Sequence, residues 1–106
     1  MTPYYQGPGR KVFLLTYSGL LLQKFMTDFL DKQPQVLHWF GILPSGILIV
    51  SRMDTFTLAN MIHAQFPNVF FVLTEVDPMK TSGWMNRQVW DFINAPKSSG
   101  RWEPPG

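Results

Sequence analysis

Two apolar runs joined by a short turn lie in the middle of the chain, and the pattern on either side mirrors itself around them. The stretch Leu37–Met53 reads LHWFGILPSGILIVSRM, with Pro44-Ser45-Gly46 between the two runs. Proline presets φ at the second position of a type I turn, and glycine suits the fourth position. The stretch therefore predicts a β-hairpin whose strands are too apolar to lie on the surface.

A strand and an amphipathic helix are predicted before the hairpin. The segment Lys11–Tyr17 is apolar on both faces of a strand, which is typical of a central strand. Ser18 can cap a helix from about Leu20 to Lys32, and Pro34 ends that helix because proline has no N–H. One stripe of this helix is apolar at the helical period; its residues are Leu22, Phe25, Met26, Phe29 and Leu30.

A second helix and a last strand are predicted after the hairpin. Asp54 or Thr55 can cap a helix from Phe56 to about Phe66. The segment Val69–Val76 (VFFVLTEV) is again apolar on both faces until its end. The order β-α-β-β-α-β predicts an α+β, ferredoxin-like fold, with a four-stranded antiparallel sheet and both helices on one face.

The 106 residues, of which 45% are hydrophobic, suit one domain with a sizeable core. Residues 1–10 contain prolines, glycines and adjacent tyrosines, and we expect a flexible N-terminal lead there. Residues 11–93 are the ferredoxin-like domain with a C-terminal arm, and residues 94–106 have the composition of a flexible tail.

Two helices on one side leave the other face of the sheet and the edge strand at residues 69–76 uncovered. An apolar face and edge of this kind favour aggregation, so something must cover them. The cover can be the C-terminal arm, a second copy of the chain or another partner. Two main alternatives stay open: the C-terminal arm covers its own sheet, or a second copy of the chain covers it with help from the arm. We expect a homodimer, whose interface candidates are Phe70, Phe71, Trp84, Trp90 and Ile93.

Charge and composition narrow the classes of partner. The net charge of +2 comes from nine basic and seven acidic residues that are dispersed along the chain. Nucleic-acid binders usually concentrate their cations, so a nucleic acid is the less favoured partner. The candidates for phosphate contacts are Arg10, Lys11, Arg52, Lys80 and Arg87.

Two absences in the sequence shape the expected location. The chain has no cysteine, which excludes disulfides and thiolate metal sites and favours the cytoplasm. No apolar run approaches the roughly 20 residues that span a bilayer, so we expect no membrane association.

One acidic pair lies close together on a single element. Glu75 and Asp77 end the last strand two residues apart, where two carboxylates can hold Mg²⁺ or act as acid and base. The alternative is that these two carboxylates only keep the end of the strand in contact with water. His38 and His63 lack the spacing of a metal site. We therefore predict no cofactor, with Mg²⁺ implied only if the chain is a nuclease.

Three segments resemble a known family: KVFLLTYS, FFVLTEVD and SGWMNRQVWDFI. Over residues 11–93 they resemble the SinR-like proteins, which are related to the small CRISPR-associated adaptation endoribonuclease family and to virulence-associated protein D. The resemblance implies a ferredoxin-like homodimer whose C-terminal segments help to join two sheets. In the nuclease relatives, an aspartate directly after the aromatic residue of the first strand contributes to a metal site between protomers. Here Ser18 follows Tyr17, and serine lacks the carboxylate that Mg²⁺ prefers.

These observations favour a non-catalytic, homodimeric interaction module that binds a protein partner, as an accessory or inhibitor in a defence-related system. Dispersed cations and an aromatic content of 15% favour protein over nucleic acid. The alternative is a metal-dependent nuclease or nucleic-acid-binding protein that uses Glu75 or Asp77.

Overall fold

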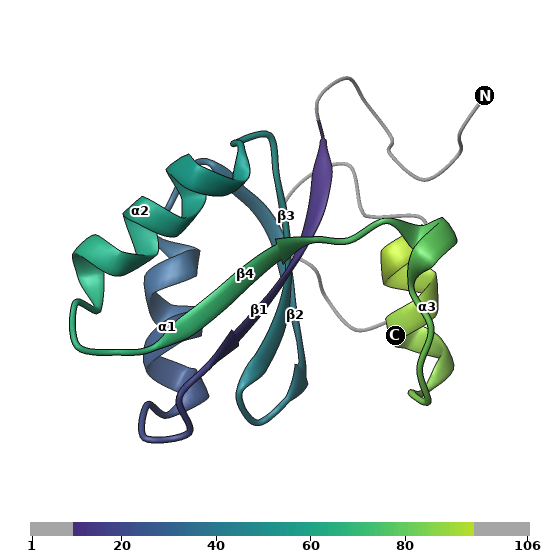
Figure 1. Cartoon of the computed structure of the whole chain (residues 1–106), viewed down its shortest axis with the longest axis horizontal. Coiled ribbons are helices and arrows are strands. Elements are labelled where there is room, and N and C mark those ends of the chain that lie inside the picture. Colours follow the sequence, from purple (N-terminus) through teal and green to yellow (C-terminus); the bar gives the residue numbers. More distant parts are fainter. Residues whose placement is uncertain (1–9, 95–106) are drawn as a thin grey trace.

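A four-stranded antiparallel sheet and three α-helices form a small α+β domain in the computed structural model (Figure 1), which describes residues 10–94. Apart from Arg10 and Asn94, the predicted lead and tail lie outside the described residues. In chain order the elements are β1 (Lys11–Tyr17), α1 (Gln23–Asp31), β2 (Val36–Leu43), β3 (Gly46–Ser51), α2 (Thr55–Gln65), β4 (Phe71–Glu75), the 3₁₀ helix η1 (Pro78–Lys80) and α3 (Arg87–Asn94).

The first strand lies inside the sheet, between β3 and β4. The strand order is β2-β3-β1-β4, and all neighbouring strands are antiparallel. Leu14 of β1 stands opposite Leu48 of β3 and Thr74 of β4. The predicted central strand is confirmed, and β2 and β4 are the two edges of the described sheet.

Alternation along β1 divides the buried side chains between two cores. Phe13 and Leu15 point toward α1 and α2, whereas Val12 and Leu14 point to the opposite face of the sheet. The helices close the first core with four fully buried side chains: Met26, Leu30, Leu58 and Ile62. Both faces of this strand are therefore covered by the chain's own elements.

The start of α1 differs from the prediction. The helix begins at Gln23, and its N-cap residue, Leu22, makes no side-chain capping bond. The Ser18 hydroxyl instead accepts a 3.4 Å hydrogen bond from the Leu20 N–H inside the preceding loop. The predicted cap at Ser18 is therefore wrong, because the loop uses that hydroxyl before the helix begins.

The buried face of α1 is rotated from the predicted stripe. Thr27, which lies outside that stripe, is buried together with Met26 and Leu30. Leu22 and Phe25 are 64% and 54% exposed. Successive positions lie about 100° apart around a helix, so burial of Thr27 beside Met26 and Leu30 turns the start of the apolar stripe toward solvent, and only its later part packs on the sheet.

The second helix follows the prediction. Asp54 is the N-cap, and its carboxylate accepts a 2.8 Å hydrogen bond from the Thr57 N–H. Leu58 and Ile62, one turn apart, are buried against the sheet. The helix and its capping by Asp54, one of the two predicted caps, are confirmed.

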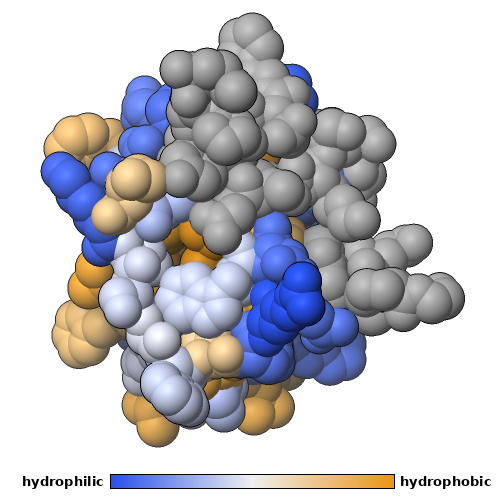
Figure 2. Space-filling view, turned by 90° about the vertical axis from the view of Figure 1, so that its right-hand side faces the viewer, coloured by the Kyte–Doolittle hydropathy of each residue, from blue (hydrophilic) through white to orange (hydrophobic). Residues whose placement is uncertain are grey.

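The third helix lies on the face of the sheet opposite α1 and α2 (Figure 1). Its buried residues Val89, Phe92 and Ile93 form one core with side chains of the sheet that include Val12, Leu48 and Val50. The ring centroids of Phe92 and Phe40 are 5.5 Å apart. Figure 2 faces this side, where hydrophobic residues show mainly along the left and lower margins. Of the two alternatives left open by the sequence, the described arm adopts the first and covers its own sheet.

We expect Phe92→Ala to lower the free energy of unfolding by about 3 kcal/mol, because it removes a buried aromatic ring and leaves a cavity between α3 and the sheet. Chemical denaturation of the full chain measures this loss. Gln88→Ala, at an exposed position of the same helix, is the matched control and should change stability little. Equal stability of the two variants would mean that α3 is not docked on the sheet.

The cap of α2 should make stability depend on pH. The hydrogen bond from Thr57 holds the pKa of Asp54 below its ordinary value, with a small contribution from Lys11. Because the pKa of Asp54 is lowered in the folded state, the cap stabilises the fold at pH values above the ordinary pKa of aspartate. This stabilisation is lost as the pH falls through the lowered pKa of the folded state. Asp54→Ala should therefore lower the melting temperature by a few degrees at neutral pH, and the difference should shrink below about pH 4. Asp54→Asn, which also caps helices, is the control; an Asp54→Ala difference that stays constant down to acidic pH would contradict the assignment.

Candidate functional site

The predicted acidic pair lies at the end of β4, where both carboxylates are exposed. Glu75 is the last residue of the strand, and Asp77 is the N-cap of η1. The Asp77 carboxylate accepts a 2.9 Å hydrogen bond from the Met79 N–H. Within residues 10–94, no group of three or more His, Asp or Glu side chains is placed to hold a metal ion. The geometry gives Asp77 a structural role as a cap.

Ser18, which the sequence resemblance would place where nucleases of that family have an aspartate, lies at the other end of β4 from the acidic pair. The Ser18 N–H donates a 2.9 Å hydrogen bond to the carbonyl of Phe70, just before β4, whereas Glu75 stands opposite Phe13. Glu75 lies five positions after Phe70, which corresponds to about 17 Å along a strand. Ser18 and the acidic pair therefore cannot form one site within a protomer.

The neighbouring Tyr17 is held at the hairpin turn. Burial raises the pKa of its phenol, and a hydrogen bond with Gln23 acts in the opposite sense. The phenol also donates a 3.4 Å hydrogen bond to the carbonyl of Pro44. The two histidines lie in unlike places, since His38 is fully buried in β2 and His63 is exposed in the last turn of α2.

Three of the five candidate cations are close together. Lys11 follows Arg10 and pairs in register with Ser51, the residue before Arg52. Arg10 is only 6% exposed, so its guanidinium is not presented to a phosphate backbone. The other two candidates follow β4: Lys80 ends η1, and Arg87 begins α3 with its Nε 3.8 Å from the Asp91 carboxylate.

The five interface candidates divide between surface and core. Phe70 and Trp84 are 88% and 98% exposed. Phe71 packs against the core beneath α1 and α2, and Trp90 and Ile93 belong to the core beneath α3. The last three residues therefore hold the protomer itself together.

A groove that the sequence analysis did not predict lies between α1 and the end of α2. It encloses about 400 Å³, and its apolar lining comes from Leu21, Phe25, Phe29 and Phe66. The rings of Phe29 and Phe66 meet edge to face, with centroids 5.5 Å apart. Phe25 is half exposed at this groove because the buried face of α1 is rotated away from it.

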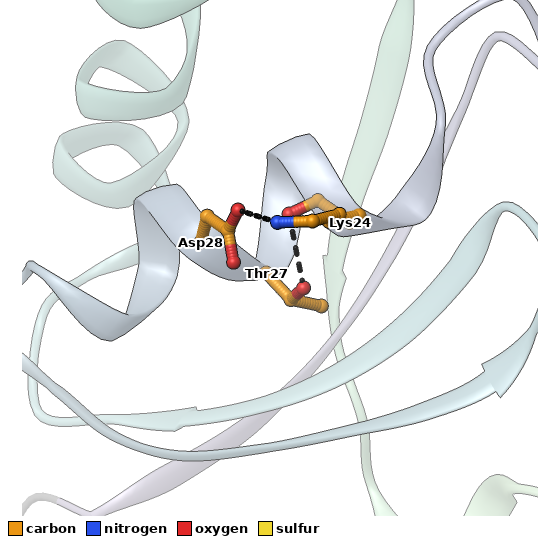
Figure 3. Close-up of polar contacts among 3 residues, drawn as sticks. All are labelled: Lys24, Thr27 and Asp28. Atoms are coloured by element: carbon orange, nitrogen blue, oxygen red, sulfur yellow. Dashed lines mark hydrogen bonds and ion pairs between the residues drawn. The ribbon is translucent and has the colours of Figure 1, made fainter.

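Charged and amide side chains surround this apolar lining. They are Asp28, Lys32, Gln33 and Gln65. The Lys24 ammonium lies 2.7 Å from the Asp28 carboxylate, and this hydrogen-bonded ion pair raises the pKa of Lys24 (Figure 3). The Thr27 hydroxyl donates a 3.2 Å hydrogen bond to the Lys24 carbonyl. An apolar centre with a charged rim is typical of protein interfaces.

The exposed apolar residues continue from this groove to the start of α1. The Gln23 side-chain amide donates a hydrogen bond to the Leu43 carbonyl, which holds the first turn of the helix against the hairpin. Leu20, Leu22 and Leu43 are all more than half exposed. We name the groove together with these three leucines the α1 surface.

A scan against protein-family models, a search of curated proteins and a search of solved structures each gave no match to this chain. None of the helices within residues 10–94 has the length and apolar character needed to cross a membrane.

Proposed function

We propose that this protein is a non-catalytic interaction module that binds a protein partner through the α1 surface. The observation that carries the proposal is that Leu22 and Phe25 lie on the solvent side of α1 although their spacing belongs to an apolar stripe. Burying them against a partner would remove apolar surface from water, which is the main driving force of association. The charged rim would set the orientation and specificity of the partner.

The proposal includes the ferredoxin-like arrangement. Its support is the element order β-α-β-β-α-β, the strand order β2-β3-β1-β4 and the position of α1 and α2 on one face. In this view α3 is an addition that closes the second face. We also infer that the module is a cytoplasmic homodimer. Its similarity to SinR-like proteins supports a role as an accessory or inhibitor in a defence-related system.

Replacing Phe25 by serine should weaken partner binding by at least about tenfold, since truncating an aromatic hot spot at the centre of an interface costs about 2 kcal/mol or more, and about 1.4 kcal/mol is already tenfold. The wild-type chain would first be used to capture partners by cross-linking in an extract of its source cells. Affinities of the purified partner for wild type and variant would then be measured by calorimetry.

Phe56→Ser is the matched control for this test. Phe56 is 83% exposed in the first turn of α2 and does not line the groove. The control should bind as wild type does. Equal affinity of wild type and Phe25→Ser for the captured partner would contradict the role of the α1 surface.

Short labelled DNA and RNA, single- and double-stranded, should remain intact with the protein in Mg²⁺ or Mn²⁺, since Asp77 caps η1 and Ser18 lies far from the acidic pair. Anisotropy across a salt series measures binding and cleavage together, because phosphate contacts weaken as salt rises. Cleavage that depends on Mg²⁺ and vanishes in Asp77→Asn or in Glu75→Gln would establish the nuclease alternative instead.

A further inference from the structure

The outer edge of β4 carries a row of unpaired backbone groups. The Ser18 N–H donates to the Phe70 carbonyl (2.9 Å), and the Val76 N–H donates to the Val12 carbonyl (2.7 Å). Both N–H and C=O of one residue point to the same side in an antiparallel ladder, and the sides alternate along the strand. The even-numbered residues of β4 therefore bond to β1. The groups that point away from the sheet belong to Phe71, Leu73 and Glu75.

No strand within residues 10–94 pairs with this outer edge, because β4 is the last strand in the sheet order. Figure 1 shows β4 (green) at the front of the sheet, with no other element drawn over it. Phe70 and Val72 are 88% and 65% exposed beside the edge, and a shallow hollow of about 240 Å³ adjoins them.

The opposite edge of the sheet has features that discourage pairing. The ladder between β2 and β3 is irregular at two places, between Val36 and His38 and between Gly41 and Leu43. The Leu43 carbonyl also accepts the hydrogen bond of the Gln23 side chain. Bulges and capped groups are the usual protection of an edge strand. The β4 ladder has a continuous register, and the strand carries no proline and no charge before Glu75.

We propose that β4 pairs antiparallel with β4 of a second copy of this chain, which would join two four-stranded sheets into one of eight strands. This inference deepens the homodimer of the proposed function and rests on it. Because α3 already covers one face of the sheet and α1 and α2 cover the other, the edge is the route by which two sheets can meet.

The register of this pairing follows from the three outward-facing residues. A two-fold axis at Leu73 places Phe71 of each copy opposite Glu75 of the second copy and Leu73 opposite its equivalent. Each of these three pairs exchanges two hydrogen bonds, about six in all. Registers shifted by one or more pairs leave some of the three residues without a partner.

Side chains also favour the register centred on Leu73. It keeps the two Glu75 carboxylates at opposite ends of the interface, whereas a register centred on Glu75 would place like charges face to face. On the α3 side of the sheet, where the side chains of Val72 and Thr74 are exposed, Val72 stands opposite Thr74 of the second copy. Such pairs of β-branched residues are common between neighbouring strands.

Charged residues introduced at positions 72 and 74 test this register. The variant Val72→Lys/Thr74→Lys places like charges opposite each other across the axis, and Val72→Glu/Thr74→Glu does the same with the other sign. We expect wild type to have twice the chain mass of 12.2 kDa by light scattering and each double variant to be monomeric. An equimolar mixture of the two variants should recover the dimer, because each lysine then faces a glutamate.

Cysteine pairing gives a second measurement that needs no charged substitution. The chain has no cysteine of its own. Mixed under mild oxidation, Val72→Cys and Thr74→Cys should form a mixed disulfide, since residues directly opposite in a non-hydrogen-bonded pair lie about 4.5 Å apart between Cα atoms. Either variant alone should cross-link much less, because its two cysteines are diagonal to each other.

A wild-type monomer at concentrations well above micromolar would overturn the proposal, and so would double variants that fold but stay dimeric. Failure of the mixture to recover the dimer, or equal cross-linking of single and mixed cysteine variants, would also overturn it. If a monomeric double variant still binds the partner, partner binding through the α1 surface does not need the β4 pairing, and the two proposals stand apart. Loss of binding in Phe25→Ser with an intact dimer would leave the β4 pairing in place.

Discussion

Burial of both faces of β1 is the constraint on which the rest of this structure depends. A strand with Val12 and Phe13 both fully buried needs one apolar layer on each side of the sheet. α1 and α2 provide one layer, and α3 provides the other. The arm after β4 is therefore part of the core, and the proposed contacts use the solvent side of α1 and the β4 edge of the sheet.

Local signals in the sequence predicted much of this architecture. β1 has the predicted bounds, the hairpin turns between Leu43 and Gly46 as expected, and Asp54 caps α2. These signals are strong because they act over few residues: alternation, a Pro-Ser-Gly turn and a carboxylate three residues before an N–H. The position of α3 depends on contacts with strands far away in the sequence, so the pattern alone left two alternatives open.

The α1 surface could not be predicted from the sequence pattern, for a different physical reason. Helical periodicity shows that Phe25 and Phe29 share a stripe, but it does not show which edge of the stripe faces the sheet. A rotation of α1 by about one position buries Thr27 and leaves Phe25 half exposed. That rotation, which tertiary packing determines, decides whether an apolar residue of α1 is buried in the core or exposed to solvent.

The place of α3 also decides how two copies can join. Exchanging the arm between protomers would first remove Val89 and Phe92 from the core that they form with Val12 and Val50, and exposure of these side chains is costly. Pairing at the β4 edge leaves that core intact, since the groups it uses are backbone atoms directed away from the sheet. The resemblance of three sequence segments to the SinR-like proteins would imply C-terminal segments that help to join two sheets. In this structure α3 is docked on its own sheet, so the proposed pairing at the β4 edge is an arrangement that would keep every buried contact of the protomer.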